Sequence, residues 1–114
     1  MAAQTFTVPK QAIEQYREEG ATVVRGAFTS WVPRLIAAHD RLQARLEAVA
    51  KVAPNGAVFG KIDHAEGFPP LTFSASKGHF GIRNAVFADP DFHAWMLQSP
   101  AADIIGQVIG ATRL

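Results

Sequence analysis

Apolar residues recur at helical spacing in the first part of the chain. Ala12, Ile13 and Tyr16 share one face of a helix that the pattern predicts from about Pro9 to Glu19. A proline is tolerated in the first turn because its missing N–H would have no partner there. Gly20 fits the position just after a helix, where a left-handed residue ends it.

The pattern then changes to a short run of β-branched residues. The stretch "ATVVRG" predicts a strand over 21–24, between two glycines. Val23 and Val24 are adjacent, so both faces of the strand carry apolar side chains. This indicates a strand that is covered on both sides.

A longer helix is predicted from Trp31 to Lys51. Thr29 or Ser30 is expected to supply the N-cap oxygen, and Pro33 falls in the first turn, where it breaks no intrahelical bond. The apolar face consists of Leu35, Ile36, His39, Leu42, Leu46 and Val49, and most of the opposite face consists of Arg34, Arg41, Arg45 and Lys51. This amphipathic pattern is typical of a surface helix on a core, and His39 is expected as a core or boundary residue.

Glycine and proline dominate the region from Ala53 to Gly81. We expect a long Gly/Pro-rich loop over 53–81, in which "AVFG" and "LTFSAS" form either brief strands or loop anchors. A loop of this length inside a small domain is usually functional or mobile. It is a candidate for covering a substrate.

Two helix starts of the same design follow. Asp89 and Ser99 are expected to cap helices whose first positions are Pro90 and Pro100, and Gly110 ends the second helix. The apolar faces consist of Phe92, Trp95 and Met96 in the first helix and of Ile104, Ile105, Val108 and Ile109 in the second. The final "ATRL" is typical of a strand that begins there. We expect both tryptophans and the eight phenylalanines to contribute to the core.

The order of these segments resembles the phytanoyl-CoA dioxygenase family of Fe(II)- and 2-oxoglutarate-dependent oxygenases. The similarity lies in "YREEGATVVRGAFTSWVPRLI", "DPDFHAW" and "SPAADIIGQVIG" and omits 53–81. It implies an α+β fold in which helices pack on a few strands and lead into a double-stranded β-helix (jelly-roll, cupin-like) barrel. It also implies an enzyme that hydroxylates a small organic substrate with iron and 2-oxoglutarate.

The family binds iron through a His-x-Asp pair and a distal histidine, and these follow the strand that "ATRL" would begin. In this sequence no histidine is followed two positions later by aspartate. The resemblance therefore implies that residues 1–114 are a single domain that forms the N-terminal part of a larger dioxygenase domain. The metal triad would lie outside this chain.

Composition and charge bear on the expected partners, the possible cysteine chemistry and the location of the protein. Net charge is +1, with 11 basic and 10 acidic residues scattered along the chain, so nucleic acid and anionic membrane are not expected as partners. There are no cysteines, which excludes disulfides, zinc-thiolate sites and a cysteine nucleophile. No secretory signal or membrane-spanning stretch is evident, so a cytoplasmic location is expected.

The sequence also offers one weak metal-site alternative. His64 and Glu66 form a His-x-Glu, which on a strand would place both ligands on one face, with His79 or His93 as a third ligand. Gly67 and the prolines that follow it favour a loop instead, because they argue against a rigid strand. The motif is also short enough to arise by chance.

A basic cluster is the remaining candidate. Lys77, His79 and Arg83 lie in a Gly-flanked stretch that could face an anionic small molecule, although a solvated turn is the more common state of such residues. His93 is expected at the surface or half-buried. No nucleophile elbow, P-loop or dinucleotide-binding motif is present.

The alternative to the oxygenase hypothesis is a small standalone α+β binding or interaction domain without catalysis. The substrate and the oligomeric state are left open.

Overall fold

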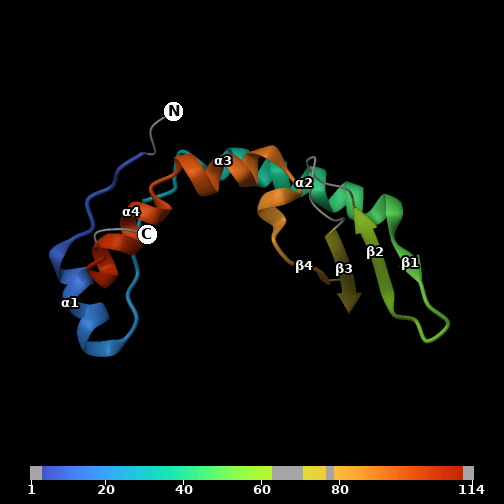
Figure 1. Ribbon diagram of the computed structural model, residues 1–114, viewed down its shortest axis with the longest axis horizontal. Helices are drawn as coiled ribbons and strands as arrows, with labels where there is room; N and C mark the ends of the chain where they lie inside the picture. Colours follow the sequence, from blue (N-terminus) through green and yellow to red (C-terminus); the bar gives the residue numbers. More distant parts are fainter. Residues whose placement is uncertain (1–3, 63–70, 77–78, 112–114) are drawn as a thin grey trace. The chain divides into compact units, whose positions relative to one another are not determined.

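The computed structural model describes residues 4–62, 71–76 and 79–111 (Figure 1). In chain order the elements are α1 (Lys10–Glu19), α2 (Val32–Val49), β1 (Lys51–Val52), β2 (Val58–Ile62), β3 (Leu71–Ser76), β4 (His79–Ile82), the 3₁₀ helix η1 (Ala85–Phe87), α3 (Pro90–Gln98) and α4 (Ala101–Ile109). The predicted α+β class is confirmed by these helices and by the antiparallel sheet of β1 to β4. Within the described ranges, no helix is both long and apolar enough to cross a bilayer.

Contacts within the chain define two compact units. The first comprises 1–32 and 94–114, and the second comprises 33–93. The boundaries fall at the start of α2 and inside α3. The expectation of one domain over 1–114 stays a prediction.

The second unit is built on a sheet whose strands are neighbours in chain order. The order is β1-β2-β3-β4, with every pair antiparallel. Gly60 pairs with Phe73, and Phe73 pairs in turn with Ile82, so these positions share one face of the sheet. That face is the buried one, because Gly60 and Phe73 are buried whereas the neighbouring Phe59 and Thr72 are exposed.

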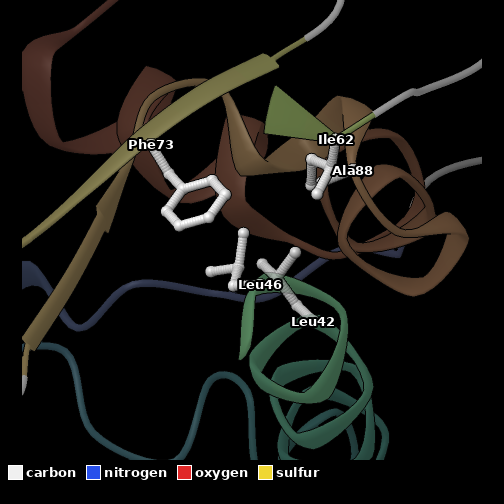
Figure 2. Close-up of a cluster of buried hydrophobic side chains, with 5 residues drawn as sticks. All are labelled: Leu42, Leu46, Ile62, Phe73 and Ala88. Atoms are coloured by element: carbon white, nitrogen blue, oxygen red, sulfur yellow. The ribbon is translucent and has the colours of Figure 1, made fainter. Parts of the chain in front are cut away.

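The core of this unit lies between the sheet and α2. It consists of Leu42, Leu46, Ile62, Phe73 and Ala88, which are all buried. Figure 2 shows the Phe73 ring above Leu46, and Ile62 beside Ala88. Leu42 and Leu46 are one helical turn apart, so they reach the sheet from the same side of α2.

One glycine in the sheet is required by close packing. A Cβ atom on Gly60 would overlap the ring of Phe73 and would lie 3.2 Å from the carbonyl oxygen of Val49. Glycine at this position therefore lets the aromatic ring lie against the backbone of β2.

In the first unit, α1 contacts α4 and the N-terminal segment is hydrogen-bonded to α4. The Val8 N–H donates to Gln107 Oε1 at 2.9 Å, and Gln107 Nε2 donates to the Phe6 carbonyl at 2.6 Å. The indole N–H of Trp31, a buried residue, donates to Gln4 Oε1 at 2.8 Å. These bonds join segments that are far apart in the sequence.

Several helix ends agree with the predictions. Gly20 and Gly110 both adopt left-handed conformations, with φ of 78° and 73°, and end α1 and α4. The Asp91 N–H donates to Asp89 Oδ1 at 2.8 Å, as expected for a cap. The Ala101 N–H donates to Ser99 Oγ at 3.3 Å, although α4 begins one residue after Pro100 rather than at it.

The predicted strand over 21–24 is wrong. These residues form no strand, and Val23 is 66% exposed rather than covered on both sides. A β-branched run favours extended backbone, but a strand also needs a neighbouring strand to accept its ladder bonds. The segment has no such neighbour within the described part of the first unit.

The predicted loop over 53–81 is also wrong for most of its described residues. They form β2, β3 and the start of β4, and the alternative that "AVFG" and "LTFSAS" form brief strands is confirmed. The glycines within the strands misled the prediction. Gly60 serves close packing inside a strand, whereas Gly56 has a positive φ in the turn between β1 and β2.

The buried stripe of α2 also differs from the predicted one. Its buried residues are Ala38, Leu42 and Leu46, whereas Ile36 is 57% exposed. His39 is not a core or boundary residue, because its side chain is 69% exposed beside Asp40. At the start of the helix, the Thr29 hydroxyl donates to the Gly26 carbonyl instead of acting as the predicted cap.

Candidate functional site

The structure leaves the sequence-predicted metal and basic candidates largely untested. His64, Glu66 and Lys77 lie outside the described residues, and so does the side chain of His79, whose backbone begins β4. Arg83 is exposed just after β4, and His93 is exposed on α3, as expected. No three His, Asp or Glu side chains gather in a metal-binding arrangement within the described ranges.

A cluster of charged side chains in the second unit joins one face of α2 to the beginning of α3. Arg34, Arg41 and Arg45 share this face because they are seven and four residues apart. Arg41 binds Asp89 through two parallel bonds, from Nε to Oδ2 and from Nη2 to Oδ1, each 3.0 Å long. This fork geometry is the strong form of an Arg–carboxylate pair.

Asp91 lies between two of these arginines. Its Oδ1 accepts from Arg34 Nη2 at 2.8 Å, and its Oδ2 accepts from Arg41 Nη2 at 2.7 Å. Arg45 Nη1 donates to the carbonyl oxygen of Ala88. The cluster therefore fixes residues 88–91 against α2. The negative charges of Asp89 and Asp91 also suit the positive end of the α3 dipole.

The electrostatics of the cluster follow from these bonds. Burial acts to raise the pKa of Asp89, but its hydrogen bonds with Arg41 and with the Asp91 N–H outweigh that effect and lower the pKa below its usual value. The bonds from Arg34 and then Arg41 lower the pKa of Asp91. The same contacts, with Asp89 first, raise the pKa of Arg41 above its ordinary value.

The chemistry that this cluster supports is structural. A general acid or base needs a pKa near the working pH, whereas both aspartates are shifted away from neutrality. Arg34 and Arg41 already bind carboxylates, and Asp89 is occupied by its helix cap as well. We therefore assign the cluster to fixing α3 and not to catalysis.

A groove of about 400 Å³ lies in the first unit between α4 and the segment that follows α1. Its lining is mainly aliphatic and consists of Tyr16, Ala21, Thr22, Val24, Ile104, Ile105, Val108 and Ile109. Ile105 and Ile109 are each 52% exposed. The segment that was predicted as a strand thus forms one wall of this groove.

A second cavity of about 480 Å³ lies on the sheet of the second unit. Its described lining residues are Val49, Lys51, Phe59, Gly60, Lys61, Thr72 and Phe73. It combines aromatic surface, two ammonium groups and one hydroxyl. Sequence reasoning missed it because the region was predicted as a loop. The alternation of Phe59 and Lys61 with buried Gly60 and Ile62 was the signal that could have revealed it.

Comparisons with protein-family models, with curated proteins and with solved structures find no match. Function is therefore argued from the residues and the geometry.

Proposed function

We propose that this chain is the N-terminal portion of a phytanoyl-CoA dioxygenase-like, Fe(II)- and 2-oxoglutarate-dependent oxygenase that hydroxylates a small organic substrate. The order of the helices supports the proposal. The four described α-helices occur in the order that the family resemblance implies. They are a helix ended by Gly20, a long second helix, a helix that begins with Asp-Pro and a helix that follows Ser-Pro and is ended by Gly110. In such an enzyme, a double-stranded β-helix barrel would follow these elements.

The observation that carries the proposal is the exposure of large aliphatic side chains on two helices. These are Ile36 and Val49 on α2, which are 57% and 41% exposed, and Ile105 and Ile109 on α4, each 52% exposed. Ile105 and Ile109 are one turn apart on α4, and aliphatic surface that recurs at this spacing is usually buried by another element. The proposal assigns its cover to the rest of the oxygenase.

The described residues do not fit an iron site. A facial triad needs two histidines and one carboxylate with open metal positions, and no group of three such ligands gathers within the described ranges. In the proposed enzyme the iron and 2-oxoglutarate would supply oxygen activation through residues outside this chain. We therefore assign no catalytic step to the described residues, only the support of the barrel.

The coding sequence downstream of Leu114 tests the proposal most directly. A His-x-Asp motif followed by a distal histidine is expected there. The longer product should then convert 2-oxoglutarate to succinate in an iron-dependent manner. Replacing the histidine of the His-x-Asp by alanine provides the matched control and should abolish succinate formation. A stop codon directly after Leu114 would contradict the proposal.

A standalone binding domain is the second candidate. It is favoured by the core of the second unit, in which Leu42, Leu46 and Phe73 are buried in one cluster of described residues. This candidate requires that the 114 residues unfold cooperatively and bind no hydrophobic dye at the helix faces. The oxygenase proposal instead expects α2 and α4 to bind such a dye in the isolated chain.

A further inference from the structure

The cavity on the sheet has the size of a small-molecule site. Its volume of about 480 Å³ falls within the range of about 300–1,000 Å³ that is typical of ligand pockets. Three neighbouring strands, β1, β2 and β3, contribute to it, and all three are visible side by side in Figure 1. A site formed by paired strands is held more rigidly than one formed by loops.

The register of the strands places four of the lining side chains on one face. Lys51 is paired with Phe59, and Lys61 is paired with Thr72. Directly paired residues of antiparallel strands project to the same side, with Cβ atoms about 5 Å apart. Phe59 and Lys61 are two residues apart on β2, so they also project together, about 7 Å apart along the strand. The phenyl ring is thus flanked by two lysines.

The exposed surfaces in this cavity indicate what it would bind. Phe59 is 47% exposed, so apolar area is left for a ligand to cover. Lysine stems can lie along an apolar ligand while the ammonium groups stay in water. The described lining residues include two lysines and no carboxylate, so the charge that complements this cavity is negative.

We propose that this cavity binds a small organic anion built on a flat aromatic ring, such as an aromatic carboxylate or sulfonate. The ring packs against Phe59, offset or edge-on as aromatic pairs prefer. The acid group lies near Lys51 or Lys61, within reach of the Thr72 hydroxyl. This proposal rests on the described residues of the second unit alone.

The test compares two fluorescent probes that differ mainly in charge. 8-Anilinonaphthalene-1-sulfonate carries the sulfonate, and N-phenyl-1-naphthylamine is its neutral counterpart. Each is titrated into the protein as the gene encodes it, by fluorescence and by amide chemical-shift mapping. We expect the sulfonate probe to bind at this cavity more tightly than the neutral probe. The largest shifts should occur at Lys51, Phe59 and Lys61.

Three variants assign the interaction to named groups. Lys51→Gln and Lys61→Gln should each weaken sulfonate binding about fivefold, which is the effect of one charge at about 4 Å in water. They should leave binding of the neutral probe unchanged. Phe59→Ser should weaken binding of both probes. Lys10→Gln is the matched control, because the Lys10 side chain is 91% exposed on α1, and it should change nothing.

Several results would overturn the proposal. Equal affinity for the two probes, or sulfonate binding unaffected by both lysine substitutions, would remove the charge argument. Shifts at Ile105 and Val108 without shifts at Lys51, Phe59 and Lys61 would assign the probe to the groove of the first unit. Loss of amide dispersion on binding would show that the dye binds a partly unfolded chain. Displacement of the probe by an acidic oligomer, but not by naphthalene-1-sulfonate, would assign the surface to a macromolecule.

Discussion

Asp89 should contribute more to the stability of the second unit than any exposed carboxylate, because it performs two functions at once. It caps α3 through the Asp91 N–H, and it forms the two-bond pair with Arg41. The residue is only 6% exposed. Two substitutions separate these functions. Asp89→Asn keeps a good N-cap side chain but removes the charge, whereas Asp89→Ala removes both.

The expected magnitudes follow from these contacts. Loss of an N-cap costs about 1 kcal/mol. Hydrogen bonds to a charged group contribute about 1.5–3 kcal/mol, and their neutral equivalents contribute about half as much. Asp89→Asn should therefore lower the free energy of unfolding by about 1 kcal/mol, and Asp89→Ala by about 3 kcal/mol. The matched control is Asp40→Asn, since the Asp40 side chain is 74% exposed on α2, and its effect should stay within about 0.5 kcal/mol.

Urea denaturation followed by far-ultraviolet circular dichroism measures these differences. The same effect from Asp89→Asn and Asp89→Ala would show that the cap contributes nothing. An effect of Asp89→Ala no larger than that of Asp40→Asn would refute the assignment of the cluster as the contact that fixes α3. Each comparison requires that the dependence of the unfolding free energy on urea concentration is unchanged, because a change in this slope would show that the substitution altered the unfolded or the native state.

The same cluster predicts how stability depends on pH. The pKa values of Asp89 and Asp91 in the folded chain lie below the unfolded value of about 3.9. Their contribution is therefore complete well above that value and is lost as the pH falls through the folded pKa values. Asp89→Asn should make the loss of stability on the acid side shallower. Identical acid-side profiles for the wild-type protein and this variant would contradict the pairing.

The remaining predictions concern packing and backbone. Gly60→Ala should destabilise the second unit by about 1–3 kcal/mol, because the Cβ of the alanine would overlap the Phe73 ring. In a double-mutant cycle measured by thermal melts, adding Phe73→Leu should recover part of this loss. Gly20→Ala should lower the free energy of unfolding by about 1 kcal/mol, because Gly20 has a φ of 78°. Gly81 has no positive φ, so Gly81→Ala should be nearly neutral, and equal effects of the two substitutions would contradict the strain argument. Gln107→Ala should speed hydrogen exchange at the Val8 amide, which donates to Gln107 Oε1, and unchanged exchange would show that this bond does not hold the N-terminal segment.

Helix boundaries were the features that sequence determined best. Gly20, Gly110, Asp89 and Ser99 each act through atoms within a few residues of themselves, so the local chain is sufficient to predict their effect. The α+β class, which the resemblance implies, is confirmed by the helices and the sheet. For "AVFG" and "LTFSAS" the local pattern predicts either strands or loop anchors, because glycine weakens the strand signal.

Pairing between distant segments decided the rest. Whether an extended β-branched run becomes a strand depends on a partner for its ladder bonds. "LTFSAS" finds partners in β2 and β4, whereas 21–24 instead forms one wall of a groove. The contacts of Arg41 with Asp89 and Asp91 span 48 and 50 residues, so helical periodicity alone could only place the arginine on a polar face.

The sheet cavity shows the same division between local and tertiary information. The alternation of Phe59 and Lys61 with buried neighbours is present in the sequence, but Lys51 and Thr72 join them only through the strand register. Register depends on turns and on which face is buried, and a shift by one residue would move each side chain of a strand to the opposite face. The sequence determined which residues were available, and the tertiary pairing determined that a phenyl ring lies between two ammonium groups.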